Sequence, residues 1–187
     1  MTIPSRRAAL KAGLTLGLAW RVAPVLEADQ EDPASARPKE GDLLIRLGDA
    51  SKTPLTPDDI PTGAPQTMAW AMDPASLIVR SGSRLNQIIL LRFDPVSLSG
   101  ATRSRAADGV VAYTAICTHN GCDVQEWLSD SSSLYCPCHE SSFDPRDGAK
   151  VVDGPAPRPL PALPLKIADG KLAAAAPFTS RVGFEPG

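Results

Sequence analysis

Every cysteine and every histidine of this 187-residue chain lies in one of two hexapeptides. The first is Cys117-Thr118-His119-Asn120-Gly121-Cys122, and the second is Cys136-Pro137-Cys138-His139-Glu140-Ser141. Thiolate and imidazole side chains are ligands that suit zinc or the iron of a cluster. A chain that concentrates all of these side chains in two segments must fold so that the segments meet. The sequence therefore predicts a metal site built from two loops.

The spacing inside each segment places two ligands where one loop can turn both to the same side. Cys117 and His119 are separated by one residue, and Cys136 and His139 are separated by two. Taken alone, these residues leave two other interpretations open. Cys2His2 is a ligand set of tetrahedral zinc, and four cysteines of an exported protein can pair as two disulfides with three connectivities. The disulfide interpretation gives neither histidine a role.

The full pattern is C-x-H-x16-C-x-x-H with one further cysteine in each segment, and it resembles that of the Rieske iron–sulfur proteins. The resemblance implies one [2Fe–2S] cluster per chain, with two cysteines on one iron and two histidines on the other. The implied ligands are Cys117, Cys136, His119 and His139. Because imidazole is neutral where thiolate is negative, such centres have potentials of about −150 to +300 mV, against about −400 mV for plant-type ferredoxins. The resemblance thus indicates an electron-transfer protein.

The same resemblance assigns roles to residues beside these ligands. Cys122 and Cys138 are expected to form a disulfide that ties the two segments together, which disfavours zinc. Ser141 matches a serine that hydrogen-bonds a bridging sulfide, whereas Phe143 stands where high-potential members carry a tyrosine. We therefore expect a potential below that of those members. Asn120 replaces the leucine that docks against cytochrome b in quinol-oxidising members, which argues against a standard quinol pocket.

The segment Gly154-Pro155-Ala156-Pro157 matches the proline-rich loop that covers the cluster in cytochrome bc and b6f members of the family. Proline fixes φ, so such a loop is a stiff lid over a redox centre. Pro155 is accordingly expected to lie in the surroundings of the cluster, and so is Gly121 of the first hexapeptide. Because more prolines follow this segment, an ordinary turn-rich connection is the alternative interpretation.

The N-terminal segment Ser5-Arg6-Arg7-Ala8-Ala9-Leu10-Lys11 resembles the twin-arginine (Tat) export motif, and a short apolar run follows it. Residues 1–26 are therefore predicted to be a targeting signal or a short membrane anchor. The 15 residues from Ala12 to Leu26 are fewer than the ~20 that a membrane-spanning helix needs. The Tat route carries folded proteins, which suits a protein that receives its cofactor before export. We expect a location in the bacterial periplasm or at the periplasmic face of the inner membrane.

The fold class is predicted to be all-β, because 19 prolines argue against long helices and β-prone runs alternate with turn signals. The resemblance implies a β-sandwich base fold with a small inserted cluster-binding subdomain. We expect a flexible linker at 27–40, a Rieske domain at 41–180 with its subdomain at about 116–154, and a C-terminal tail at 181–187. An exposed insertion is expected at Ser97–Asp108. The expected strands are Leu43–Leu47, Ser76–Arg80, Gln87–Phe93, Val110–Ile116, Leu134–Cys136, Leu163–Ile167 and Lys171–Ala174.

Charge and composition exclude two classes of function. Residues 27–187 contain 15 basic and 21 acidic side chains, a net charge of −6, so this part of the chain has no electrostatic footprint for nucleic acid. A catalytic Rieske oxygenase needs a second iron held by two histidines and a carboxylate. The chain contains two histidines in total, both already assigned to the cluster, which excludes a self-contained oxygenase.

These features predict an exported electron-transfer subunit of an oxidoreductase complex rather than a self-contained enzyme. The expected complex resembles a respiratory quinol–cytochrome c reductase, with a cytochrome b-type membrane subunit and quinol on the donor side and a c-type cytochrome as acceptor. His119 and His139 would contact quinol and take a proton together with the electron. The alternative is the small Rieske subunit of a periplasmic oxidoreductase, such as an arsenite-oxidase-like enzyme, with a large oxidoreductase subunit as donor.

Overall fold

The computed structural model describes residues 32–63 and 65–184. The chain divides into one unit at Met1–Gln30 and a second at Glu31–Gly187, and the described residues belong to the second. The predicted twin-arginine segment at 1–26 lies outside the described residues. Among the helices of the described ranges, none combines the length and the apolar character that crossing a bilayer requires.

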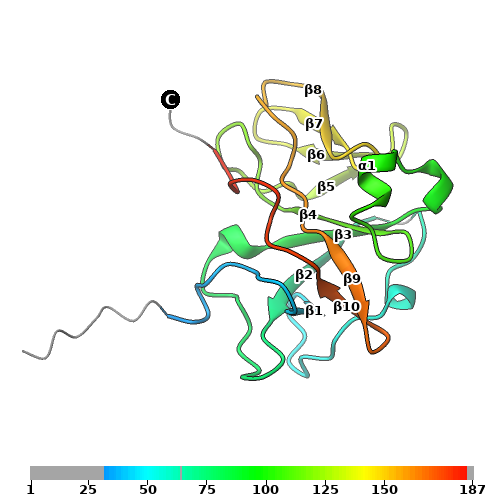
Figure 1. The fold of residues 1–187 in the computed structure, drawn as a ribbon. Coiled ribbons are helices and arrows are strands. Elements are labelled where there is room, and N and C mark those ends of the chain that lie inside the picture. The colour runs from blue at the N-terminus through cyan, green and yellow to red at the C-terminus, as the bar shows by residue number, and fades with distance from the viewer. Residues whose placement is uncertain (1–31, 64, 185–187) are drawn as a thin grey trace, which may run out of the picture. The chain divides into compact units, whose positions relative to one another are not determined.

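Strands dominate the described part of the chain, which confirms the predicted all-β class (Figure 1). Within the described residues, ten strands form two antiparallel sheets. The helical elements in this part of the chain are single turns. They are α1 (Gly100–Arg103) and the 3-10 helices η1 (Pro57–Asp59), η2 (Arg84–Asn86) and η3 (Pro95–Ser97).

The larger sheet, which we call the base sheet, has six strands in the order β4-β3-β2-β1-β10-β9. The sheet curls, because the chain just before β9 returns to β4. There the Leu163 N–H donates to the Ala112 carbonyl at 2.9 Å, and Ala162 forms a bridge with Tyr113. The curled sheet encloses an apolar core that includes the fully buried Leu90. Its strands are β1 (Leu43–Arg46), β2 (Thr67–Met72), β3 (Ile88–Arg92), β4 (Val110–Thr114), β9 (Leu165–Ala168) and β10 (Lys171–Ala174).

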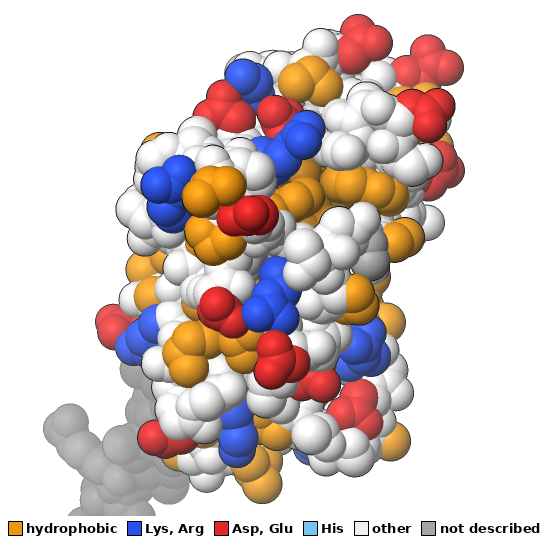
Figure 2. Space-filling model, turned by 90° about the vertical axis from the view of Figure 1, so that its right-hand side faces the viewer, with side chains coloured by type: hydrophobic (Ala, Val, Ile, Leu, Met, Phe, Trp, Pro, Cys, Tyr) orange, Lys and Arg blue, Asp and Glu red, His pale blue; other side chains and the backbone are white. Residues whose placement is uncertain are grey.

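The smaller sheet, which we call the cluster sheet, has four strands in the order β5-β6-β7-β8. It lies between β4 and β9 in the chain, so the inserted subdomain of the predicted fold is present. Figure 1 shows this sheet at the end away from β1 and β10, and Figure 2 shows acidic side chains gathered on one face at that end. Its strands are β5 (Glu126–Leu128), β6 (Ser133–Cys136), β7 (Ser141–Asp144) and β8 (Lys150–Asp153).

Strands β3 and β4 are buried on both faces because they separate two apolar cores. Successive side chains of a strand point to opposite faces of its sheet. On β3, Ile88 and Leu90 enter the core of the base sheet. Ile89 and Leu91 enter a second core, which β4 supplies with Tyr113 and which continues beneath the cluster sheet. The inserted subdomain therefore packs on the base sheet through strands that belong to the base.

One predicted strand, Ser76–Arg80, is wrong, because this segment forms a turn. The Leu77 N–H donates to the carbonyl of Asp73 at 2.8 Å, and Leu77 itself has a φ of 56°. The Asp73 side chain also accepts backbone N–H bonds within the turn, as is usual for aspartate in turns. A single bridge between Val79 and Met72 is the remaining β-type contact in this segment.

The other predicted strands correspond to β1, β3, β4, β6, β9 and β10, with ends displaced by up to two residues. Four strands were not predicted: β2, β5, β7 and β8. The sequence of β2 is TMAWAM, which contains one β-branched residue, so its pattern is weak. Strands β5, β7 and β8 have three or four residues each, too few to show an alternation.

The segment Ser97–Asp108 was predicted to be an exposed insertion, but part of it is buried. Leu98, Thr102 and Ala107 are each less than 7% exposed. The hydroxyl of Thr102 accepts a hydrogen bond from the Gly148 N–H at 2.8 Å. This bond ties the segment to the loop between β7 and β8, so its position is set by a tertiary contact that local sequence does not show.

Residues 32–40, the described part of the predicted linker, contact the base domain. The Arg37 guanidinium donates to the Asn86 side-chain oxygen at 3.2 Å, and the Asn86 amide donates to the Ala36 carbonyl at 2.8 Å. The Lys39 ammonium lies 3.2 Å from the Asp73 carboxylate. These contacts place the chain leading into β1 against the turn between β2 and β3.

Candidate metal centre

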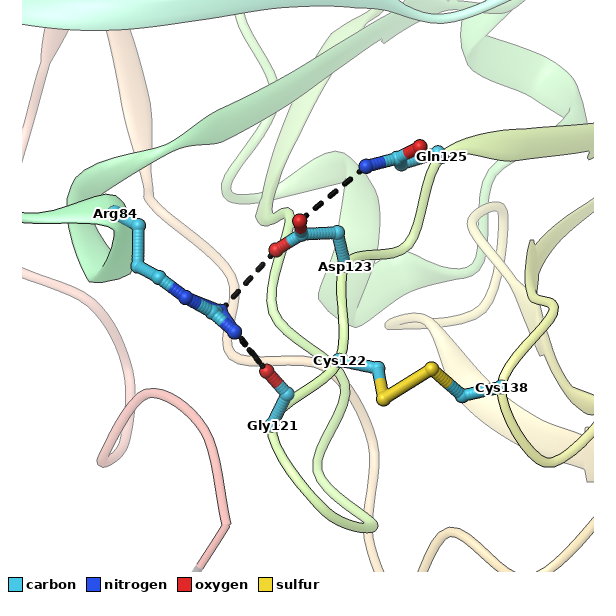
Figure 3. The surroundings of a disulfide bond; sticks show 6 residues. All are labelled: Arg84, Gly121, Cys122, Asp123, Gln125 and Cys138. Atoms are coloured by element: carbon cyan, nitrogen blue, oxygen red, sulfur yellow. Dashed lines mark hydrogen bonds and ion pairs between the residues drawn. A yellow bond between two sulfur atoms is a disulfide. The ribbon is translucent and has the colours of Figure 1, made fainter.

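The two hexapeptides form two loops that a disulfide joins. The first loop (117–122) follows β4, and the second loop (136–141) is the hairpin connection between β6 and β7. A disulfide links Cys122 of the first loop to Cys138 of the second, with 6.4 Å between their Cα atoms (Figure 3). The disulfide is the one that the resemblance implied, and it brings the four predicted ligands into one region.

The first loop is a closed turn with His119 near its tip. The Cys117 N–H donates to the Cys122 carbonyl at 2.7 Å, and the Gly121 N–H donates to the Cys117 carbonyl at 3.1 Å. Gly121 has a φ of +74°, a backbone conformation that favours glycine. The turn therefore depends on the residue type at Gly121, and this is a local reason for the glycine that the motif contains.

The two cysteines that do not form the disulfide are buried together. Cys117 and Cys136 are each 1% exposed and belong to the apolar core that contains Phe143. Burial raises the pKa of the Cys117 thiol to about 11, and the Cys136 thiol lies beside it. The backbone N–H groups of His119 and Asn120 lower that pKa by donating to the Cys117 sulfur. A metal ion that bound here would supply the positive charge that displaces the proton.

The two histidines also form a pair. The ring centroids of His119 and His139 are 4.6 Å apart, and the rings meet edge to face at 82°. His139 is exposed and His119 is half-buried. The Nδ1 atom of His119 is buried and has no hydrogen-bond partner in the structure. A buried ring nitrogen without a partner is costly unless a ligand or metal occupies it.

The donor atoms thus approach as a sulfur pair and an imidazole pair. Within residues 32–63 and 65–184, no three His, Cys, Asp or Glu side chains converge on one point. One tetrahedral metal needs four ligands around a common centre, whereas a two-iron cluster takes two from each side. The buried thiols and the unpartnered His119 Nδ1 fit the second arrangement, and they are suitable donors for a [2Fe–2S] group.

The predicted proline loop (154–157) packs directly on the second loop. Gly154 has a φ of +85°, and a Cβ atom there would lie 2.6 Å from backbone atoms of Glu140 and Ser141. Ser141 is fully buried, and its hydroxyl oxygen accepts a hydrogen bond from the Ala156 N–H at 3.2 Å. Pro155 is exposed beside this contact. The loop therefore covers one side of the predicted site.

Two residues of the site were not predicted from the sequence. The Thr118 hydroxyl donates to the Arg158 carbonyl at 2.6 Å, which ties the first loop to the chain after the proline loop. The Arg84 guanidinium donates to the Gly121 carbonyl from the other side. Thr118 lies inside the motif and could have been suspected. Arg84 lies 37 residues before Gly121, and no local pattern links them.

Comparison with known proteins agrees with this geometry. A model of the Rieske [2Fe-2S] domain matches residues 57–164. The cytochrome bc1 complex Rieske iron-sulfur subunit of Streptomyces lividans is 34% identical over 151 residues, which cover 77% of this chain and 85% of that protein. A Haloferax mediterranei protein, provisionally named as the Rieske subunit of a respiratory nitrate reductase, is 39% identical over 106 residues. That match covers 56% of this chain and 47% of the relative.

Among solved structures, the ferredoxin of carbazole 1,9a-dioxygenase from Nocardioides aromaticivorans has a TM-score of 0.43 and 18% identity. The match covers 72% of this chain and 98% of the ferredoxin, at a similarity too low to inform function. The family model matches more than half of the chain, in the part that contains both loops and the proline loop. The [2Fe–2S] cluster is the cofactor of that domain. The chain therefore belongs to the Rieske [2Fe–2S] domain family.

Proposed function

We propose that this protein is a one-electron carrier and serves as the exported iron–sulfur subunit of a respiratory complex similar to quinol–cytochrome c reductase. The observation that carries the proposal is the arrangement of the donor atoms. A buried thiol pair lies next to an imidazole pair that reaches the surface, and one disulfide joins their loops. This arrangement shields the sulfur side of the site and leaves the histidine side open to a partner.

The proposed ligands follow from this arrangement. Cys117 and Cys136 would hold one iron, and His119 and His139 would hold the other. When bound, the cluster supplies one-electron redox chemistry. For His119, the buried Nδ1 without a partner is the proposed donor atom, which leaves Nε2 of the same ring to carry a proton.

Proton coupling is proposed for the exposed histidine edge. His139 is exposed, so a ring N–H there can donate a hydrogen bond to an oxygen of quinol or quinone. A histidine that keeps its proton in one redox state and gives it up in the other makes the potential depend on pH. The roles of His119 and His139 at this edge are to bind, orient and exchange the proton, and no other catalytic group on the chain is required.

Three features support the cytochrome bc type of complex. The relative from Streptomyces lividans, which this chain matches over 85% of its length, bears the name of a bc1 Rieske subunit. Ser141, to which the resemblance assigns a hydrogen bond to a cluster sulfur, is buried at the start of β7 and pairs with the proposed ligand Cys136. The proline loop packs on the backbone of the second loop, as a cover of the site requires.

The proposed partners are a membrane cytochrome b-type subunit with quinol as donor and a c-type cytochrome as acceptor. The acidic balance of residues 27–187, and the acidic side chains gathered near the cluster sheet in Figure 2, suit a basic acceptor surface. The proposed location is the periplasm or the periplasmic face of the inner membrane, reached by the Tat route. That part of the proposal rests on the sequence of residues 1–26.

The second candidate is the small Rieske subunit of a periplasmic oxidoreductase, with a large catalytic subunit as donor. Two residues favour it: Asn120, polar and exposed at the tip of the first loop, and Phe143, which has no hydroxyl to bond a ligand sulfur. The Haloferax mediterranei relative is named for an enzyme of this general kind. In this case the electron arrives from the large subunit, and the quinol role of the histidines does not apply.

Purification of the native protein from membranes and periplasm tests both candidates. Iron and acid-labile sulfide should each be near two per chain, and a protein with one zinc and no iron would end the cluster proposal. Co-purification with a cytochrome b from the membrane fraction supports the first candidate. Co-purification with a large oxidoreductase, and no quinol oxidation by the purified complex, supports the second.

A further inference from the structure

Arg84 projects from a firmly anchored turn of the base domain. It begins η2, where the Ser83 hydroxyl accepts the Leu85 N–H at 3.3 Å. Two residues later, Asn86 is fully buried, and its side-chain amide donates to the carbonyls of Ala36 at 2.8 Å and Arg80 at 3.1 Å. Because these hydrogen bonds anchor Asn86, they also fix the backbone of η2 from which the Arg84 side chain extends.

The Arg84 guanidinium reaches the first loop, as Figure 3 shows. Its two terminal nitrogens both donate to the Gly121 carbonyl, one of them at 2.9 Å. The first of these nitrogens also lies 3.2 Å from a carboxylate oxygen of Asp123. Gln125 donates to the other oxygen of Asp123 at 3.3 Å, so that carboxylate is held as well.

The Gly121 carbonyl is a sensitive point of the first loop. The Gly121 N–H closes the turn by donating to the Cys117 carbonyl, and the peptide that carries the Gly121 carbonyl leads directly into Cys122. His119 lies between the two ends of this turn. The disulfide ties the first loop to the second, whereas Arg84 ties the first loop to the base domain. A rotation of the peptide after Gly121 would change the orientation of the whole turn.

We propose that Arg84 is a positioning residue for the redox site, which holds the His119-bearing turn in its geometry through the Gly121 carbonyl. The inference rests on the proposed ligand role of His119. Arg84 is 53% exposed and Asp123 is 37% exposed, so solvent screens their charges and the ion pair adds little to global stability. The expected role is therefore local: the contact restricts the turn, and the guanidinium charge favours the reduced, more negative form of the site.

The test compares Arg84→Gln with Arg92→Gln as a matched control. Arg92 makes the same kinds of contact, with the Pro57 carbonyl at 2.9 Å and with the carboxylates of Asp58 and Asp108. It pairs with Val110, at the end of β4 remote from the first loop. Both variants thus lose an arginine that bonds a carbonyl and a carboxylate, but only Arg84 lies beside the first loop.

Two readouts separate positioning from a general structural role. In Arg84→Gln the Gly121 amide should exchange with deuterium at least about threefold faster, because local opening of the turn becomes easier. The electron paramagnetic resonance signal of the reduced protein should broaden, since the His119 turn then samples several orientations. The midpoint potential should shift downward because a cation is lost. Arg92→Gln should leave all three unchanged.

Charge and contact are separated by a second pair of variants. Arg84→Gln with Asp123→Asn restores the local net charge but not the contact, so its potential should return toward the wild-type value while exchange at Gly121 stays fast. Arg84→Lys keeps the charge with a single point donor instead of the planar fork. It should retain the potential and show exchange between that of wild type and Arg84→Gln.

The proposal is overturned if Arg84→Gln has wild-type exchange at Gly121 and a wild-type spectrum, or if Arg92→Gln changes both to the same extent. It is also overturned if the double variant restores wild-type exchange and spectrum, because the contact would then be unnecessary. These outcomes differ from failure of the proposed ligand set, in which the wild-type protein itself lacks iron and shows no spectrum to compare. They also differ from failure of the bc-type proposal, in which the wild-type protein keeps its spectrum but co-purifies with a large oxidoreductase.

Discussion

The hydroxyl oxygen of Ser141 accepts a hydrogen bond from the backbone N–H of Ala156, 3.2 Å away, and both residues are buried. Ser141 begins β7 and Ala156 belongs to the proline loop. A hydroxyl that accepts one hydrogen bond still has its own proton to donate. The proline loop therefore orients the Ser141 hydroxyl as a donor, which is the role that the resemblance to quinol-oxidising Rieske proteins assigns to it.

Ser141→Ala should lower the midpoint potential by roughly 40 mV, the one-electron equivalent of a hydrogen bond of about 1 kcal/mol. The physical reason is that a donor to a cluster sulfur stabilises the reduced, more negative form. Redox titration measures the change. Ser142→Ala is the matched control, because Ser142 is also buried but points to the opposite face of β7. Equal potentials for Ser141→Ala and wild type would contradict the donor role.

Phe143→Tyr should raise the midpoint potential. Phe143 is fully buried in the same apolar core as Cys117 and Cys136, so an added hydroxyl would enter the core that contains the proposed ligand sulfurs. A hydrogen bond from that hydroxyl to a cysteine sulfur favours the reduced form. Protein-film voltammetry of the two proteins measures the shift. An unchanged potential in a folded, iron-loaded variant means that the hydroxyl reaches no sulfur.

Cys122→Ser should destabilise the site without removing a ligand. The disulfide closes a segment of 16 residues, for which chain-entropy estimates give a stabilisation of about 3 kcal/mol. Iron should be incorporated but lost faster on warming, which the decay of the visible absorption band follows. Cys138→Ser should behave in the same way. If either variant retains iron as long as wild type does, the disulfide is not what keeps the two loops together.

His139→Ala should abolish iron binding and leave the base sheet folded. His139 is exposed and lies outside both apolar cores, so its loss removes a proposed donor atom but little packing. Iron and sulfide analysis, together with circular dichroism in the far ultraviolet, checks both parts. Retention of two irons per chain would remove His139 from the ligand set.

Asp42→Asn should lower the free energy of unfolding by about 3 kcal/mol without moving the midpoint potential. Asp42 and Arg80 form a buried two-pronged ion pair, with nitrogen–oxygen distances of 2.5 and 3.0 Å. Loss of one partner leaves the other charge buried and poorly compensated. Denaturant titration measures the change. Asp73→Asn is the control: Asp73 is more exposed and 3.7 Å from Arg80, so its loss should lower the free energy of unfolding much less than Asp42→Asn does.

The ligand loops were predictable from the sequence because metal chemistry admits few residue types and a loop admits few spacings. The disulfide and the proline loop were expected only from the resemblance to the family; in the structure Cys122 is bonded to Cys138, and Gly154 packs where a Cβ atom has no room. In contrast, β2 escaped prediction because its sequence, TMAWAM, has one β-branched residue and no apolar–polar alternation, although its burial in the sheet does alternate. Arg84 escaped because its contact depends on the fold bringing η2 beside the first loop.

Strands β3 and β4 are buried on both faces, so the part of the molecule that contains the proposed redox site cannot be separated cleanly from the base sheet. The interior beneath the cluster sheet takes Ile89, Leu91 and Tyr113 from those two strands, so residues 116–154 cut out as a fragment would lack part of their own interior. Transplantation of the electron-carrying loops into another scaffold must therefore include both strands. A suitable recipient is a sheet that can accept these two strands and that already has an apolar core against the face opposite the transplanted loops.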